Sequence, residues 1–185
     1  MRKLKMEELG RVSVEEFKDT DKTPIVVVLD NVRSALNIGS AFRTADAFAC
    51  EEMILCGITA QPPHREILKT ALGSTESVAW RHFEETQTAL ETLRTEGYII
   101  VAVEQAENPI LLQYIHNQPF TNKKIALIFG NEVDGVSEEA MAMADFVVEI
   151  PQYGTKHSLN IAVSIGIVVW EFLKGFRNFQ LQYKS

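Results

Sequence analysis

Ile25-Val26-Val27-Val28-Leu29 is an unbroken apolar run near the start of the chain. A strand with one solvent-exposed face alternates apolar with polar residues, whereas a strand covered on both faces is apolar throughout, as in parallel sheets. Further apolar runs follow at 53–56, 98–103, 125–129 and 146–150. Segments with the composition of helices separate several of these runs. The sequence therefore predicts an α/β domain built on a parallel sheet.

The segments between and after the strands have helical character. In 86–96, Ala89, Leu90 and Leu93 fall on one face, and Gly97 supplies a stop signal. Further helices are expected at 37–48, 65–72, 137–144 and 161–173. The last of these is apolar on most of its faces, which exceeds what packing on one side of a sheet requires. We therefore expect this helix to form part of a homodimer interface.

The chain length of 185 residues suits one domain with a sizeable core. We expect that domain to cover residues 24–174, after a short helical extension over 1–23 and before a tail over 175–185. Nothing between these limits has the composition of a linker, and no internal repeat is visible.

Composition and charge exclude several classes of protein. No run of about eighteen apolar residues is present, so we expect no membrane-spanning helix, and the basic start is not followed by the apolar segment of a secretory signal. Cys50 and Cys56 lack the spacing of metal ligands, and we expect free buried thiols in a reducing, cytoplasmic compartment. The net charge of −7 counts against a nucleic-acid binder, although a whole-chain balance says little about one face.

The common nucleotide-binding and hydrolytic motifs are not found in this sequence. No G-x-G-x-x-G follows the first strand, and neither a P-loop nor a G-x-S-x-G elbow occurs. We expect no metal site, because the histidines lack the spacing of zinc ligands: His64, His82, His116 and His157.

Because ligands of parallel sheets bind at the carboxyl ends of the strands, the loops at those ends are expected to carry the function. In the first such loop, Asn37 and Arg43 belong to the start of a helix. Six residues place them roughly 600° apart around the helix, so they share no single stripe, but they could converge on a ligand beside the helix start. The alternative interpretation is an N-cap asparagine and a surface arginine.

Two later loops have similar character. In 129–137, glycines flank an acidic segment, and Glu132 lies outside the first turn of the next helix, so helix capping does not explain it. In 150–160, a turn and a polar stretch lead into the apolar helix. Ser158 or Asn160 could simply cap that helix, and His157 could be a solvated loop residue.

Taken together, the three loops resemble the SpoU or TrmH family of RNA 2′-O-ribose methyltransferases, within the SPOUT superfamily. The resembling motifs are Asn37-x-Gly39-x-x-x-Arg43-Thr44-Ala45, Phe129-Gly130-Asn131-Glu132-x-x-Gly135 and Ile150-Pro151-x-x-Gly154-x-x-x-Ser158-Leu159-Asn160. The resemblance runs in order from about Pro24 to Leu173. It departs from the family pattern at Val133, where glycine is common, and at Ser34, where asparagine is common.

The resemblance implies a parallel-sheet, Rossmann-like fold with a deep C-terminal trefoil knot, and a homodimer. It implies S-adenosylmethionine as the methyl donor, bound without a metal and largely by backbone groups. The expected donor-binding residues are Val103, Gly130, Ile150, Ser158 and Leu159. Methyl transfer to a ribose 2′-hydroxyl of a structured RNA is the implied reaction, with tRNA favoured over rRNA because the short ends resemble those of tRNA-modifying members.

The family assigns the motif arginine, here Arg43, a central catalytic role, in some proposals as the general base. A guanidinium holds its proton firmly, so we prefer the hypothesis that Arg43 clamps the phosphate beside the target ribose. Asn37, Glu132, Ser158 and Asn160 would then orient Arg43 and the ribose. Further candidates for RNA contacts are the basic residues Arg33, Arg65, Lys69 and Lys156. The alternatives are a non-catalytic RNA-binding or assembly protein with this fold, and a SPOUT enzyme that methylates a base.

Overall fold

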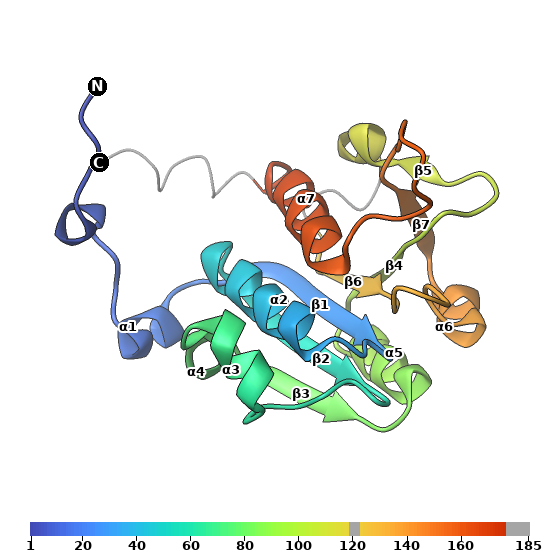
Figure 1. Ribbon diagram of the computed structural model, residues 1–185. Helices are drawn as coiled ribbons and strands as arrows, with labels where there is room; N and C mark the ends of the chain where they lie inside the picture. The colour runs from blue at the N-terminus through green and yellow to red at the C-terminus, as the bar shows by residue number, and fades with distance from the viewer. Residues whose placement is uncertain (119–122, 177–185) are drawn as a thin grey trace.

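The computed structural model describes residues 1–118 and 123–176. Within these residues the strands form one parallel sheet in the order β3-β2-β1-β6-β4-β7-β5, drawn in Figure 1. The strands are β1 (Thr23–Asp30), β2 (Cys50–Cys56), β3 (Trp80–Phe83), β4 (Ile99–Val103), β5 (Ile110–Leu111), β6 (Ile125–Phe129) and β7 (Phe146–Glu149). The predicted α/β class with a parallel, Rossmann-like sheet is confirmed.

Strand β1 lies inside the sheet, between β2 and β6. Its residues divide between the two faces: Val27 packs in one hydrophobic cluster and Val28 in the other, and both are fully buried. Leu29 is in register with Leu55 of β2 and Phe129 of β6, so these strands end at the same edge of the sheet. The unbroken apolar run is therefore explained by helices on both faces.

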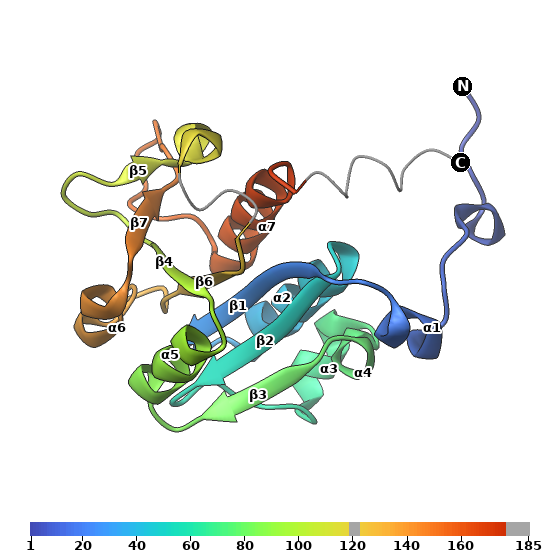
Figure 2. The same cartoon turned by 180° about the vertical axis from the view of Figure 1, so that it is seen from behind.

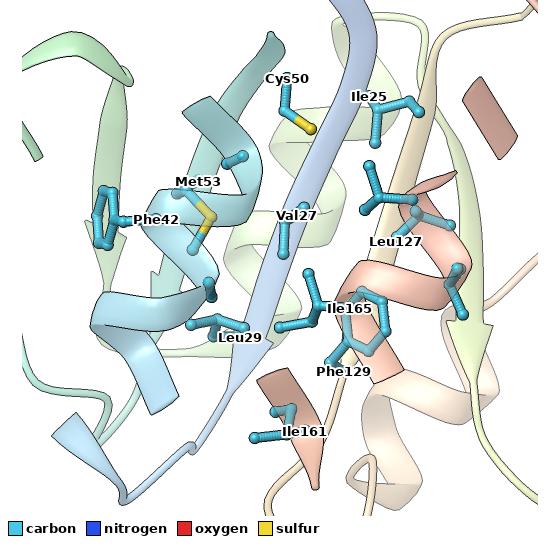
Figure 3. Close-up of a cluster of buried hydrophobic side chains, with 14 of the residues drawn as sticks. Ile25, Val27, Leu29, Phe42, Cys50, Met53, Leu127, Phe129, Ile161 and Ile165 are labelled. Atoms are coloured by element: carbon cyan, nitrogen blue, oxygen red, sulfur yellow. The ribbon is translucent and has the colours of Figure 1, made fainter. Parts of the chain in front are cut away.

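Helices cover each face of the sheet, as the two views in Figures 1 and 2 show. One face carries α2 (Ala35–Ala47), α3 (Arg65–Ala71) and α7 (Ile161–Leu173), whose buried residues share a cluster with Val27 and Leu29. Figure 3 shows Ile165 of α7 and Phe42 of α2 in that cluster. The opposite face carries α5 (Thr86–Thr95) and α6 (Glu138–Met143).

The remaining elements are short and were not predicted: α4 (Ser74–Ser77), β3, β5 and the 3₁₀ helix η2 (Leu112–Asn117). The 1–23 extension contains the 3₁₀ helix η1 (Met6–Leu9) and α1 (Val14–Asp19), while its last residue already belongs to β1. Most of the expected tail, 177–185, lies outside the described residues.

Helix boundaries differ from prediction at α2. The helix begins at Ala35, and Ser34 is its N-cap, because the Ser34 hydroxyl accepts a hydrogen bond from the Asn37 backbone N–H at 3.3 Å. The interpretation of Asn37 as the N-cap is therefore wrong, and its side chain is free for another role. At α7 the expected cap is confirmed: Asn160 Oδ1 accepts from the Ala162 N–H at 2.9 Å.

Cys50 and Cys56 are free and buried, as predicted. Burial raises the pKa of both thiols to about 12, which keeps them protonated and poorly nucleophilic. No helix in the described part of the chain is long and apolar enough to cross a membrane.

Candidate functional site

A cleft of about 320 Å³ opens where β4, β6 and β7 end. The loop after β6 and the loop between β7 and α7 supply most of its lining. The residues predicted to bind the donor all line this cleft: Val103, Gly130, Ile150, Ser158 and Leu159. The volume is within the range of ligand pockets, and the position is the one that parallel sheets use for ligands.

The loop after β6 is folded tightly on itself. Asn131 Oδ1 accepts hydrogen bonds from the N–H groups of Val133 and Asp134, both at 2.9 Å, and the Gly135 N–H donates to the Asn131 carbonyl at 3.0 Å. A methyl group on Gly130 would overlap the backbone of Gly135. The family resemblance implies that Gly130 binds the donor, but the structure gives a nearer reason for a glycine at this position, the close approach of the loop's own backbone.

Two carboxylates hold this loop in place, and neither was predicted from the sequence. Asp30, 1% exposed, accepts from the Ser137 N–H at 2.8 Å and from the Thr86 hydroxyl at 2.6 Å. Glu104 accepts from the Val136 N–H at 3.0 Å. Asp30 is the last residue of β1 and Glu104 directly follows β4, so each acid comes straight after a buried apolar run, and that position was the available signal.

Three residues predicted to be catalytic come together beside the cleft. Asn37 Nδ2 donates to Glu132 Oε1 at 2.5 Å, and Asn160 Nδ2 donates to Asn37 Oδ1 at 3.2 Å. One residue comes from each of the loops singled out in the sequence, and the contacts cross up to 123 positions of chain. In the resulting Asn37–Glu132–Asn160 network, Glu132 and Asn160 are exposed and Asn37 is half-buried, so the remaining hydrogen-bonding capacity of the network is available to a ligand.

The charge of the cleft has one sign. Among the described residues that line it, the acids are Glu104, Glu132, Asp134 and Glu149, and no lysine or arginine is present. Arg33 lies 3.8 Å from Asp134, but it does not line the cleft. An acidic cleft favours a ligand with net positive charge and disfavours a phosphate.

Arg43 lies elsewhere, in a second cavity of about 570 Å³ between α2, α3 and α7. Lys69 lines the same cavity, and so does Gly166 of α7. Within the described residues, Arg43 makes no hydrogen bond or ion pair. Six residues of helix separate it from Asn37, which is about 9 Å along the axis and a different direction around it. Within one chain, Arg43 therefore lies apart from the Asn37–Glu132–Asn160 network.

The remaining candidates have separate positions. Ser158 lines the cleft but is not hydrogen-bonded to the network. Gly39 of the first motif allows α2 to pack closely on α3, because a methyl group there would overlap the Ile67 carbonyl. Of the other basic candidates, Arg65 begins α3 and Lys156 is exposed in the loop before α7. The described residues contain no cluster of three His, Cys, Asp or Glu side chains placed to hold a metal ion.

A sequence model described as the SpoU rRNA Methylase family matches residues 24–170. The chain is 30% identical over 164 residues to a tRNA (guanosine(18)-2′-O)-methyltransferase of Thermus thermophilus, covering 89% of this chain and 81% of that protein. It is 26% identical over 173 residues to the enzyme of the same name from Borreliella burgdorferi, covering 94% and 77%.

Among solved structures, the AdoMet-bound rRNA methyltransferase from Sinorhizobium meliloti superposes with a TM-score of 0.76 at 29% identity. The superposition covers 85% of this chain and 59% of that one, so the Sinorhizobium protein is considerably longer.

Proposed function

Because the chain belongs to the SpoU rRNA Methylase family, we propose that it transfers a methyl group from S-adenosylmethionine to a ribose 2′-hydroxyl of a structured RNA. The observation that carries the proposal is the Asn37–Glu132–Asn160 network beside the acidic cleft. The proposal favours tRNA over rRNA, since the Thermus and Borreliella relatives are named as tRNA enzymes. Its site of action would be the cytoplasm.

The cleft suits this donor in charge and in lining. S-adenosylmethionine carries a sulfonium and an ammonium group against one carboxylate, and the charged residues around the cleft are acids. Val103, Ile150 and Leu159 offer apolar contacts to the nucleoside, while the backbone around Gly130 offers hydrogen bonds. When bound, the donor supplies an electrophilic methyl group, and the protein's part is to hold the ribose hydroxyl in line with it. We propose that no metal takes part.

The network would position the ribose. Asn37 holds one oxygen of Glu132, and the other oxygen remains free to accept a hydrogen bond from a ribose hydroxyl. Asn160 fixes the orientation of the Asn37 amide, so that its nitrogen rather than its oxygen faces Glu132. Ser158, on the lining of the cleft, lies between this network and the donor in our proposal. The 2′-hydroxyl as target would also separate RNA from DNA.

Arg43 would bind the phosphate next to the target ribose, through the two-pronged hydrogen bonding of its guanidinium. Lys69 lines the same cavity and adds positive charge there. The two cavities would therefore bind different substrates according to their charge. The donor would bind in the acidic cleft and the RNA phosphate in the basic cavity.

We further propose a homodimer formed through α7. Val163, Ile167 and Trp170 lie on one side of that helix and are 50%, 39% and 50% exposed. Gly166 lies on the same helix and lines the Arg43 cavity, so a second copy docked on α7 would lie beside Arg43. Arg43 would then serve the donor cleft of the partner, which accounts for its separation from the network within one chain.

The proposed domain is 24–174, with 1–23 as an extension, in agreement with the matched range of 24–170. We propose that its C-terminal part is knotted as a trefoil. The proposal rests on the family resemblance. The structure adds that the loop before α7 lies against the segment after β4, where the Gln105 side chain donates to the His157 carbonyl at 2.6 Å, and that α7 packs against α2.

The test is transfer of a labelled methyl group from S-adenosylmethionine to transcripts of tRNA and of rRNA fragments. Incorporation into tRNA is the expected result. Incorporation only into rRNA fragments would show that the substrate is rRNA rather than tRNA. No incorporation into any RNA, by a protein that binds the donor, would favour a non-catalytic role.

A further inference from the structure

Within the described part of the chain, Glu104 is the one acid of the cleft that accepts hydrogen bonds through both carboxylate oxygens. Oε2 accepts from the Val136 N–H at 3.0 Å, and Oε1 accepts from the Gln105 N–H at 2.8 Å. Gly135 has a φ of 70°, and a side chain there would overlap the Glu104 carboxylate. The glycine is thus required both by its backbone conformation and by the closeness of Glu104.

Asp30, a carboxylate whose role is to hold the loop in place, differs from Glu104 in burial and in hydrogen bonding. Asp30 holds the same loop at Ser137, the residue directly after Val136. It is 1% exposed and accepts three hydrogen bonds, from Ser137, Thr86 and Asn31. Glu104 is only half-buried, lines the cleft, and has no cationic partner among the described residues. Each of its oxygens keeps a lone pair unused by the two N–H donors.

We propose that Glu104 binds the ribose hydroxyls of the methyl donor's nucleoside, an inference that rests on the proposed function. An ionised carboxylate only accepts hydrogen bonds, and a ribose offers two neighbouring O–H donors. Hydrogen bonds to a charged acceptor are stronger than those between neutral groups. An acid that follows a strand of a parallel sheet meets ribose hydroxyls in the same way in dinucleotide-binding folds.

Two groups of the donor could bind Glu104, the ribose and the positively charged sulfonium. The change in charge during the reaction favours the ribose. The sulfonium loses its positive charge as the methyl group leaves. A carboxylate fixed beside it would stabilise the bound donor more than the transition state, and would slow the reaction. The ribose is neutral and unchanged by the reaction, so a fixed carboxylate there holds donor and product equally. Glu104→Gln is therefore expected to raise KM for the donor and leave kcat nearly unchanged.

The test is calorimetric binding of S-adenosylhomocysteine and of its 2′-deoxy and 3′-deoxy analogues. The parent protein should lose about tenfold in affinity when a bound hydroxyl is removed, the usual strength of a hydrogen bond to a charged group. Glu104→Gln should bind S-adenosylhomocysteine about tenfold more weakly, and should then lose little more when the hydroxyl is removed.

Asp30→Asn is the matched control, because it makes the same carboxylate-to-amide change at the other brace of the loop. It should weaken all three ligands by the same factor. If Glu104→Gln behaves in that way too, Glu104 is only a brace and the inference is wrong. Equal binding of all three ligands by the parent protein would overturn it without any variant. Failure of the parent protein to bind S-adenosylhomocysteine would instead overturn the proposed function itself.

Discussion

At the scale of single residues, Glu132 and Arg43 show how the charges are separated. Glu132 lies in the acidic cleft and is held by Asn37, whereas Arg43 lies with Lys69 in a different cavity. A guanidinium beside Glu132 in the same chain would form an ion pair and occupy the carboxylate. Because the two side chains are apart, Glu132 remains available to a ribose hydroxyl and Arg43 to an RNA phosphate, as we propose.

Arg43→Ala should remove most methyl transfer while leaving folding and donor affinity nearly intact, since Arg43 is exposed and makes no hydrogen bond or ion pair within the described residues. Arg43→Lys should restore little, because a point charge does not reproduce the guanidinium fork. Single-turnover transfer at saturating donor and RNA separates chemistry from binding. Arg11→Ala is the control, because Arg11 is exposed, lines neither cavity and is not among the candidate RNA contacts. Near-normal transfer by Arg43→Ala would remove the phosphate clamp from our account.

Gly130→Ala should weaken binding of S-adenosylhomocysteine by at least about tenfold, because even a methyl group overlaps the backbone of Gly135 and reshapes the cleft. Gly154→Ala is the matched control: Gly154 lies in the loop before α7, has no positive φ, and has open space where an alanine methyl group would lie. Calorimetry on both variants, with melting curves to confirm folding, makes the comparison. Unchanged affinity in a folded Gly130→Ala protein would mean that the donor cleft is misplaced.

At the scale of elements, Asn160 at the start of α7 has both a structural and a functional role. One side-chain atom caps the helix through Ala162, and another contacts Asn37. Asn160→Ser should keep the cap, because serine is also a good N-cap, but its shorter side chain cannot reach Asn37. We therefore expect normal stability and strongly reduced methyl transfer.

Asn160→Ala is the comparison for this prediction, because it removes both roles. It should lower stability by about 1 kcal/mol, or about 2–4 °C in melting temperature, and reduce transfer equally. If Asn160→Ser retains full activity, Asn160 is a helix cap and nothing more.

The elements predicted from the sequence are those with a clear periodic signal. The runs that became β1 and β6 are buried on both faces, and α5 has one apolar face, so pattern and burial agree. Strand β3 was missed because all of its residues are only partly buried and carry mixed polarity, and β5 because two residues give no period. The spacing of Asn37 and Arg43 already placed them on different sides of α2. Which cavity Arg43 would line depends on how α2 packs against α3 and α7, and spacing alone does not reveal that packing.

At the scale of the whole molecule, the exposed apolar side of α7 is the feature that a monomer does not explain. Light scattering at micromolar concentration should give the mass of a dimer. Ile167→Glu, in the middle of that side, should give a monomer that binds S-adenosylhomocysteine but transfers little, because Arg43 of the partner is lost. Ile58→Glu is the control, since Ile58 is 63% exposed and lies in the loop after β2. A monomeric parent protein with full activity would rule out the shared site.

The central claim is methylation of a ribose 2′-hydroxyl, and the product nucleoside tests it most directly. RNA methylated with isotopically labelled donor would be digested to nucleosides and analysed by mass spectrometry. Our account predicts that the label is found on the ribose fragment, and that the modified linkage resists alkaline cleavage because its 2′-oxygen is blocked. A label found on the base fragment, with the linkage still cleaved by alkali, would contradict it.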